Sequence, residues 1–390
     1  HFINEKLLFP EVGHPEVFSL NVYANAGCNI LTMIGNLFDP KTIDQCFDDN
    51  NEYPLMGIKD DEGNWNVFGN KDRVIRISEV ERAVFSRLYD DSDNSSEARL
   101  PIIHAKQLVD VLQKMSLKGS LQSISNELYT TQCFDETGAQ DKNIITVNPS
   151  FVQDGLGFVY NGPHIGVANP VSQTARAEVK TKGDFDRVDI TFIPDNYLQR
   201  TKYNRAVDEQ SYIKEIPSTP WGVNYVKTYK LLSRKMLNLK QERTLISAIA
   251  PPNTAHINGI FGIAFKDLRK MSLMSAYMES VPYDYFIKSM GKTNLLDNNA
   301  AQLPFFESKY SDALICRTLL LNCVTNKYSE LWKNVFEGSF VNDSWAKKDN
   351  RLKTETFSQL SAEWTHDTPI RSDYERRMAL VEIDVLTSMA

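Results

Sequence analysis

The fold class is decided by three β-rich runs in the middle of the sequence, Ile144-Ile145-Thr146-Val147, Gly157-Phe158-Val159-Tyr160 and Asp189-Ile190-Thr191-Phe192-Ile193. Each run carries β-branched or aromatic side chains between turn-forming residues, which is the pattern of short strands. Another short buried strand is expected at residues 245–250. Around and after these strands, apolar residues recur with helical spacing at 221–238, 267–289, 312–336 and 371–390. This arrangement predicts an α+β fold, a mixed-sheet region with a helical C-terminal extension.

The first 142 residues combine short strands with helices. Residues 16–35 predict two strands joined by a turn. Residues 77–89 predict a helix that Ser78 and Glu81 can cap reciprocally, and residues 104–117 predict another. We therefore divide the chain into an N-terminal α+β connector at 1–142, a strand-rich domain at 143–305 and a helical region at 306–390.

Composition excludes several classes of protein. The chain has 390 residues, of which 42% are hydrophobic, enough for a packed core. No apolar run approaches the roughly 20 residues needed to span a bilayer, and no signal peptide opens the sequence. The five cysteines form no Cys-x-x-Cys pair, so neither a metal site nor a disulfide framework is indicated. We expect free thiols in a cytoplasmic protein that has no membrane partner.

Charge is distributed unevenly along the chain. The net charge is -7, yet residues 176–243 hold 8 Lys and 6 Arg against 9 acidic residues, a local charge of +5. Residues 1–150 hold 13 basic and 23 acidic residues, a local charge of -10. A basic middle in an acidic chain is typical of a localised phosphate-binding face. An ordinary solvated surface would give the same count, and charge alone does not separate the two.

Two basic segments combine the side chains that DNA contact requires. Residues 200–205, Arg-Thr-Lys-Tyr-Asn-Arg, mix cations for phosphates with polar groups for base edges. The helix predicted at 221–238 places basic residues opposite its apolar face, although a solvated amphipathic helix explains each of them as well. The candidate DNA contacts are Lys180, Lys182, Arg187, Arg200, Lys202, Arg205, Lys227, Lys230, Arg234 and Lys235.

Three patterns that could indicate catalysis are weak. Asn148-Pro149-Ser150-Phe151 follows a β-rich run, as the Asn-Pro-Pro-aromatic motif of amino-methyltransferases does, but Ser150 replaces the second proline and no Gly-rich cofactor loop is present. Glu178-Val179-Lys180 matches a pattern of magnesium nucleases that is common by chance. His104, His164 and His256 have no nucleophile elbow beside them. We predict no catalytic residue in this chain, and hydrogen-bonded core or loop positions for the histidines.

A longer set of motifs follows a consistent order. It begins with Asn161-Gly162-Pro163-His164 and Ala168-Asn169-Pro170, and continues through residues 243–249 and Tyr283-Asp284-Tyr285-Phe286. It ends with Gly291-Lys292-Thr293-Asn294-Leu295, Gln302-Leu303-Pro304 and residues 376–384, Arg-Arg-Met-Ala-Leu-Val-Glu-Ile-Asp. Together these resemble the C-terminal half of large bacterial adenine-specific DNA methyltransferases, the fused type IIG restriction-modification and phage-defence methylases.

The resemblance implies a division of labour. Residues 143–305 would be the target-recognition domain, and residues 1–142 would connect it to a catalytic domain upstream of His1. That upstream domain of the same protein would bind S-adenosylmethionine and methylate adenine N6, so this chain would need no cofactor of its own. His1 in place of Met, and the apolar spacing that continues to Met389, predict that the chain is a fragment of this larger protein. Its partner would be double-stranded DNA, held while a base is flipped.

A function of another class fits the same sequence. The acidic N-terminal part and the helical tail would also suit a protein-interaction module of a phage-defence complex, with only incidental DNA contact. The recognition sequence, and whether the parent protein also cleaves DNA, are not encoded in any motif of this chain.

Overall fold

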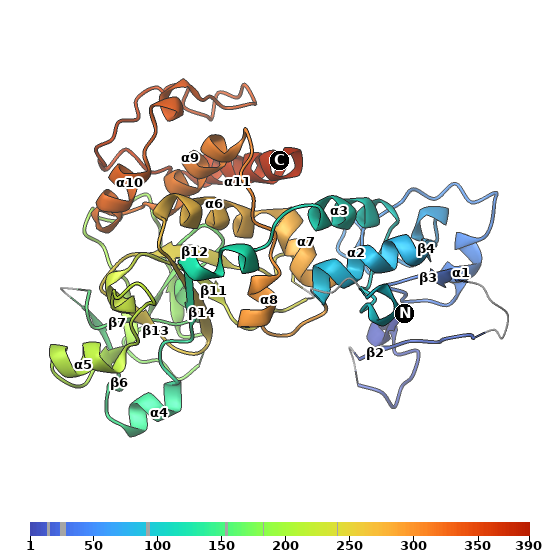
Figure 1. Ribbon diagram of the computed structural model, residues 1–390, viewed down its shortest axis with the longest axis horizontal. Helices are drawn as coiled ribbons and strands as arrows, with labels where there is room; N and C mark the ends of the chain where they lie inside the picture. Colours follow the sequence, from blue (N-terminus) through green and yellow to red (C-terminus); the bar gives the residue numbers. More distant parts are fainter. Residues whose placement is uncertain (14–15, 24–28, 91–93, 153–154, 182, 240) are drawn as a thin grey trace. The chain divides into compact units, whose positions relative to one another are not determined.

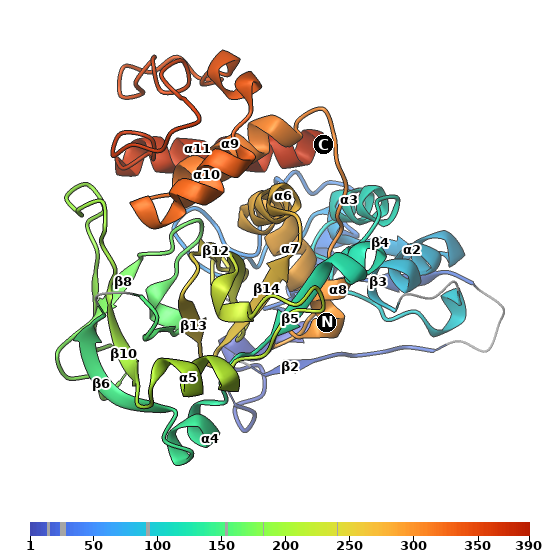
Figure 2. The ribbon, with the colours of Figure 1, turned by 60° about the vertical axis from the view of Figure 1, so that its left-hand side comes forward.

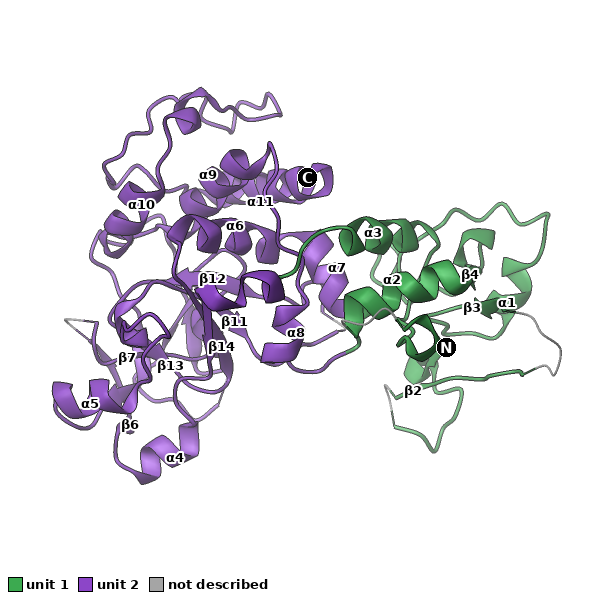
Figure 3. Cartoon of the chain, in the orientation of Figure 1, with its two compact units in different colours: residues 1–120, 289–291 green, residues 121–288, 292–390 purple. Residues whose placement is uncertain are grey.

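The computed structural model describes residues 1–13, 16–23, 29–90, 94–152, 155–181, 183–239 and 241–390. The chain divides into two compact units, residues 1–120 with 289–291 and residues 121–288 with 292–390 (Figure 3). Both contain helices and small sheets, which confirms the α+β fold class. The division at 120/121 differs from the boundary predicted at 142/143, and residues 306–390 belong to the same unit as residues 143–288.

The first unit packs two helices beside a small antiparallel strand pair. Arg73 is buried at its centre, and its guanidinium donates hydrogen bonds to the carbonyls of Gly35, Asn36 and Phe68 at 2.8–3.1 Å. Helix α2 carries the predicted capping box between Ser78 and Glu81. The elements of this unit are β1 Phe2–Ile3, β2 Val17–Phe18, β3 Leu31–Met33, α1 Lys41–Cys46, β4 Ile75–Ile77, α2 Glu79–Tyr89 and α3 Gln107–Ser116.

The second unit is built on a four-stranded antiparallel sheet in the order β12-β11-β14-β5, with a parallel pair β7-β13 and two further antiparallel pairs, β6-β10 and β8-β9. Its strands are β5 Leu128–Thr131, β6 Ile145–Phe151, β7 Phe158–Tyr160, β8 Gln173–Ala175, β9 Phe185–Arg187, β10 Arg200–Arg205, β11 Lys230–Arg234, β12 Ser247–Ala250, β13 Thr254–His256 and β14 Ile260–Phe265.

Helices α6, α9 and α11 form a layer over this sheet, with α6 against its strands (Figures 1 and 2). The helices of the unit are α4 Glu136–Asp141, α5 Glu209–Glu215, α6 Leu268–Glu279, α7 Val281–Ser289, α8 Asp297–Ala301, α9 Ser311–Asn322, α10 Ser329–Val335 and α11 Asp373–Met389. None of the helices in the described part of the chain combines the length and apolar character that crossing a lipid bilayer requires.

The outer edge of β12 is closed by side chains instead of another strand. The Ile249 amide donates to Asn322 Oδ1 at 2.9 Å, and the Tyr328 hydroxyl donates to the Ile249 carbonyl at 2.8 Å. The Asn322 amide nitrogen donates in turn to Glu279 Oε1 at 2.8 Å and to the Thr318 carbonyl at 2.9 Å, which fixes the orientation of the amide. This network joins α6, α9 and the sheet, because a buried backbone group without a partner is costly.

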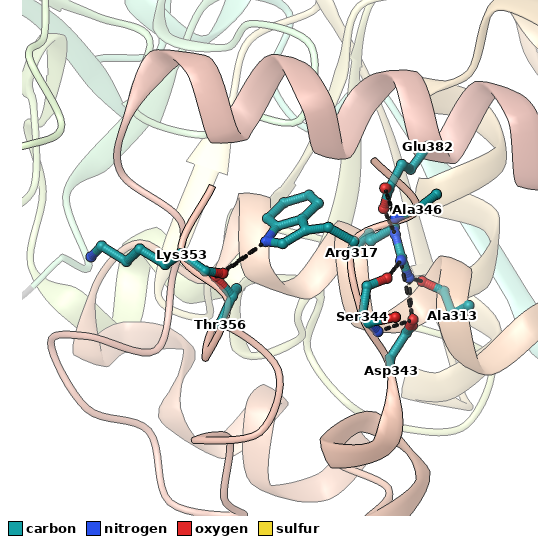
Figure 4. A network of polar contacts seen from close by, with 9 residues as sticks. Ala313, Arg317, Asp343, Ser344, Ala346, Lys353, Thr356 and Glu382 are labelled. Carbon is teal, nitrogen blue, oxygen red and sulfur yellow. Dashed lines mark hydrogen bonds and ion pairs between the residues drawn. The ribbon is translucent and has the colours of Figure 1, made fainter. Parts of the chain in front are cut away.

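The helical extension is attached through two buried arginines. Arg376 on α11 donates to the carbonyls of Leu321, Ile370 and Ala168 at 2.8–2.9 Å. Arg317 on α9 bonds to Glu382 on α11 at 2.7 Å and to Asp343 at 2.5 Å, so that one guanidinium joins two helices and the loop that precedes α11 (Figure 4). Within that loop the Trp345 indole donates a hydrogen bond to the Lys353 carbonyl at 3.1 Å.

Several predicted elements are confirmed with small changes in their bounds. They are the helices at 77–89, 104–117 and 371–390 and the strands at 144–147, 157–160 and 245–250, which correspond to α2, α3, α11, β6, β7 and β12. The two strands predicted within 16–35 form, but β2 pairs with β1 and β3 pairs with β4. The turn predicted between them, at Ala26-Gly27, lies outside the described residues.

The helix predicted at 221–238 is wrong. The segment contains one 3₁₀ turn at Tyr225–Lys227 and then the strand β11, which lies in the middle of the sheet between β12 and β14. Because β11 is buried on both faces, its apolar residues do not alternate with polar ones, and their spacing with Tyr225 and Tyr229 matched a helical period by coincidence.

Other predicted elements are interrupted or displaced. The helix predicted at 267–289 breaks at Ser280, where α7 restarts with Pro282 in its first turn, a position that needs no backbone donor. The helix predicted at 312–336 stops at Asn322 and resumes as α10, with Tyr328 in the interval. The strand predicted at 189–193 is a turn, and β9 precedes it.

Replacing Asn322 by Ala tests the closure of the sheet edge. The substitution leaves the buried Ile249 amide without an acceptor and removes one of the three donors to Glu279, so we expect the free energy of unfolding, measured by urea denaturation, to fall by about 1–3 kcal/mol. Asn326→Ala, on an exposed asparagine four residues away, should change it by less than about 0.5 kcal/mol. Equal losses in the two variants would contradict a specific role for the Asn322 amide.

Candidate nucleic-acid interface

The basic segment 200–205 forms β10, which pairs antiparallel with β6 as a two-stranded ribbon (Figure 2). Alternate residues of β10 face opposite sides, as strand geometry requires. Thr201 and Tyr203 are fully buried, whereas Arg200, Lys202 and Asn204 retain exposed surface. The sequence therefore produces one face that attaches the ribbon and one that carries basic and amide side chains.

The buried face attaches the ribbon to β7. Thr201 Oγ1 accepts a hydrogen bond from the Val159 amide at 3.3 Å and donates one to the Val159 carbonyl at 3.0 Å. Tyr203 packs into the cluster that includes Val159 and Ala255. The ribbon is thus held by the core of the unit and is positioned like an element of its sheet system.

A β-bulge interrupts the ribbon at Pro149. Ser150 lies opposite Thr201 and Val147 lies opposite Tyr203, so that Asn148 and Pro149 together face Lys202. Proline has no backbone N–H to donate to a ladder, and a bulge on an edge strand is a place where it is tolerated. The carbonyl of Asn148 accepts a hydrogen bond from Asn204 at 2.6 Å.

The two cations of the exposed face differ in their surroundings. The Arg200 guanidinium carbon lies 4.8 Å from the centroid of the exposed Phe151 ring, and the described residues offer it no acidic partner. Lys202 Nζ lies 3.6 Å from Glu136 Oε1 and 4.6 Å from the centroid of the Tyr203 ring. Arg200 therefore carries a positive charge that no described acidic residue offsets, while Glu136 partly offsets the charge of Lys202.

The remaining predicted contacts are dispersed. Lys180 and Arg187 are exposed on the β8-β9 hairpin, and Lys182 lies outside the described residues. Arg205 is half-buried against Gly157, and one of its buried guanidinium nitrogens has no hydrogen-bond partner. The others bond to neighbouring groups of the protein, Lys227 to Asn253 Oδ1, Arg234 to the Ile165 carbonyl and Lys235 to Gln132 Oε1, at 2.7–3.0 Å.

Lys230 does not contribute to any surface, contrary to the sequence prediction. It lies on β11 with no exposed area, and its ammonium group donates to the Thr254 carbonyl at 2.8 Å. Desolvation lowers its pKa from 10.5 to about 7. The helix prediction had placed it on a polar face, whereas the strand places it inside the core.

Two of the sequence patterns considered for catalysis, at residues 148–151 and 178–180, lie in a strand and in a loop. The Asn148-Pro149 segment is an open strand at a bulge, and its Asn148 carbonyl accepts a hydrogen bond from Asn204. Residues 178–180 lie in the loop between β8 and β9, where Asp184 accepts from the Lys180 amide and Asp186 pairs with Arg176. Within the described ranges no three His, Cys, Asp or Glu side chains are grouped to hold a metal ion.

The three histidines lie in hydrogen-bonded core or loop positions, as predicted. His164 Nδ1 accepts from the Asn161 amide, His256 Nε2 bonds to the Tyr225 hydroxyl, and His104 Nε2 bonds to the Met56 carbonyl. Burial lowers the pKa of His104 and His164 to about 4 and that of His256 to about 3. All three are therefore neutral at physiological pH, and they stabilise loops and the core.

The sequence predicted a strand at 144–147, which overlaps β6, and it identified the basic segment 200–205. It did not reveal the residues that contact Arg200 and Lys202. Glu136 is 66 positions from Lys202, and Phe151 is 49 positions from Arg200, and no local pattern links them. The only available signal was the presence of Pro149 in an otherwise β-rich run, which is typical of an edge strand.

Comparison with known proteins adds no further assignment, since neither the protein-family models nor the curated proteins include a match to this chain.

The buried amine of Lys230 should make stability depend on pH. Between pH 7 and 10.5 the unfolded chain binds a proton that the folded chain does not, so the free energy of unfolding should rise with pH across this window. The contribution of one proton is up to about 1.4 kcal/mol per pH unit. We expect Lys230→Met to remove that slope in urea titrations at several pH values, and Lys266→Met, on an exposed lysine, to keep it. An unchanged slope in Lys230→Met would mean that this amine stays charged in the core.

Proposed function

We propose that this chain is the DNA-recognition module of an S-adenosylmethionine-dependent DNA adenine-N6 methyltransferase, with methyl transfer carried out by a domain outside these residues. The module contacts double-stranded DNA through the exposed face of the β6-β10 ribbon. The observation that carries the proposal is this ribbon: a two-stranded element that presents Arg200, Lys202 and Asn204 at alternate positions.

The shape and charge of the ribbon suit a duplex. The major groove of B-DNA admits a two-stranded β-ribbon, and cations along it can contact phosphates on either side. The Arg200 guanidinium lies near the Phe151 ring and has no acidic partner among the residues that the structure describes, so it can contact a phosphate or the edge of a guanine. Attachment through Thr201 and Tyr203 gives the ribbon a fixed support, so less ordering is needed on binding.

The motifs that carry the resemblance contact one another within the second unit. Asp284 accepts hydrogen bonds from the amides of Thr244 and Leu245 at 2.6 Å each. The Tyr283 hydroxyl donates to the Pro304 carbonyl at 2.6 Å, and Arg376 donates to the Ala168 carbonyl at 2.8 Å. Motifs that are distant in sequence are thus joined by hydrogen bonds within one unit. This contact supports treating them together as evidence for the proposal.

A protein-interaction module is the second candidate, and one observation favours it. In the first unit Leu20, Val22 and Tyr23 are 71%, 98% and 89% exposed, an unusual run of apolar surface. Such surface is typical of a protein contact. The two candidates differ in the salt dependence of duplex binding, since only a phosphate-contacting ribbon releases condensed counterions.

Salt titration of binding to a mixed-sequence duplex tests the ribbon, with anisotropy as the readout. The logarithm of the binding constant should fall linearly with the logarithm of salt concentration, by about 0.9 per phosphate contact. Arg200→Ala should reduce the magnitude of that slope by about 0.9. Lys202→Ala should have a smaller effect, because Glu136 already offsets the lysine.

Glu136→Gln provides a change of opposite sign, since it removes a carboxylate that repels DNA and competes for Lys202. We expect it to tighten binding and to steepen the slope. Lys214→Ala, on an exposed lysine of α5, is the matched control and should leave the slope near the wild-type value. Wild-type binding that is absent or insensitive to salt would overturn the proposed function.

A further inference from the structure

Asn204 lies on the exposed face of the ribbon with its amide held in one orientation. Its Nδ2 donates to the Asn148 carbonyl at 2.6 Å and also to Ser150 Oγ. A carbonyl oxygen can only accept, so the group that faces Asn148 must be the NH₂ and not the oxygen of the amide. The two N–H bonds of Asn204 are therefore both used within the ribbon, on the residues that flank the Pro149 bulge.

The same bonds leave Asn204 Oδ1 as the group available to a ligand. No partner of this oxygen is found among the described residues, and the Asn204 side chain is partly exposed. Asn204 thus presents an oriented acceptor on the exposed face of β10. An oriented acceptor selects a ligand that offers an N–H donor and disfavours one that offers another lone pair.

The major-groove edges of the bases divide by this property. Adenine N6 and cytosine N4 carry amino donors, whereas guanine O6 and thymine O4 are acceptors. The usual pairing of asparagine with adenine is bidentate and also needs an N–H for adenine N7. Asn204 has no N–H to spare, so it can meet the amino group alone, and that group is common to adenine and cytosine.

We infer that Asn204 is a specificity-determining residue, whose Oδ1 accepts a hydrogen bond from the amino group of adenine or cytosine in the major groove. This inference rests on the proposed function, because it requires the ribbon to enter a duplex. It assigns to one position of the recognition site a preference for either amino-bearing base over guanine and thymine. The bulge at Pro149 has a role in this assignment, since Asn148, whose carbonyl accepts from Asn204, is one of the two residues that form it.

Selection from a randomised duplex library, with the whole chain as bait, tests the assignment. The wild-type chain should enrich one position in which adenine and cytosine occur about equally. Asn204→Ala should lose the preference at that position and keep the others. Asn350→Ala, on an exposed asparagine of another loop in the same unit, is the control and should retain every preference.

A second measurement uses the unaltered protein and therefore does not depend on how well the variant folds. At the preferred position adenine is replaced by purine, which lacks the 6-amino group. Wild-type affinity should fall roughly 2- to 10-fold, the effect of losing one hydrogen bond. Asn204→Ala should bind both duplexes alike, at the reduced affinity.

The outcomes separate the two claims. Salt-independent or absent duplex binding overturns the proposed function and the inference with it. Salt-dependent binding with an unchanged base preference in Asn204→Ala, or wild-type affinity that ignores the loss of the amino group, overturns the inference alone. A strict preference for adenine over cytosine also contradicts it, because it would require the N–H groups that Asn148 and Ser150 occupy.

Discussion

The structure of the second unit depends on how the edge of a buried sheet obtains its hydrogen bonds. β12 is an edge strand that lies under helices, where water cannot pair with its backbone. Asn322 and Tyr328 supply the acceptor and the donor that a neighbouring strand would provide to Ile249. A side chain can replace a strand in this way only if its own orientation is fixed, and Glu279 and Thr318 fix the amide of Asn322.

This constraint explains the positions of the helices. Because Glu279 ends α6 and Asn322 ends α9, both helices must terminate at the sheet edge, and the next turn must bring Tyr328 back toward Ile249. Burial raises the pKa of Glu279 to about 7, although Thr318, Ser275 and Asn322 donate hydrogen bonds to its carboxyl group. The helical extension, anchored by Arg376, completes the layer that keeps this network dry.

The sequence predicted those elements whose local pattern and final environment agree. Helix α2 has an amphipathic face and a capping box, and both are present in the structure. β11 shows the opposite case, since a central strand buried on both faces lacks alternation, and the lysine within it indicated a surface that does not exist. In α11 the expected apolar spacing lies outward: Val381, Val385 and Met389 are half-exposed, while Arg376 and Glu382 are buried. On that face Arg376 bonds to backbone carbonyls and Glu382 pairs with Arg317, beside the buried apolar residues Ala379 and Ile383.

In the candidate interface, too, the local pattern predicted the kinds of side chain but not their long-range contacts. Residues 200–205 carry the right kinds of side chain, and the strand alternation of β10 could be anticipated once a strand was assumed. The partners that give those side chains their properties, Phe151 for Arg200 and Glu136 for Lys202, come from pairings across some 50 to 70 residues, which no local pattern encodes. Hydrogen exchange of the whole chain, measured with and without duplex DNA, tests the assignment of the β6-β10 ribbon as the DNA-contacting element most directly. The account predicts that amide exchange at residues 145–151 and 200–205 becomes slower on DNA binding. Unchanged exchange in these two strands, with slower exchange in other segments, would contradict it.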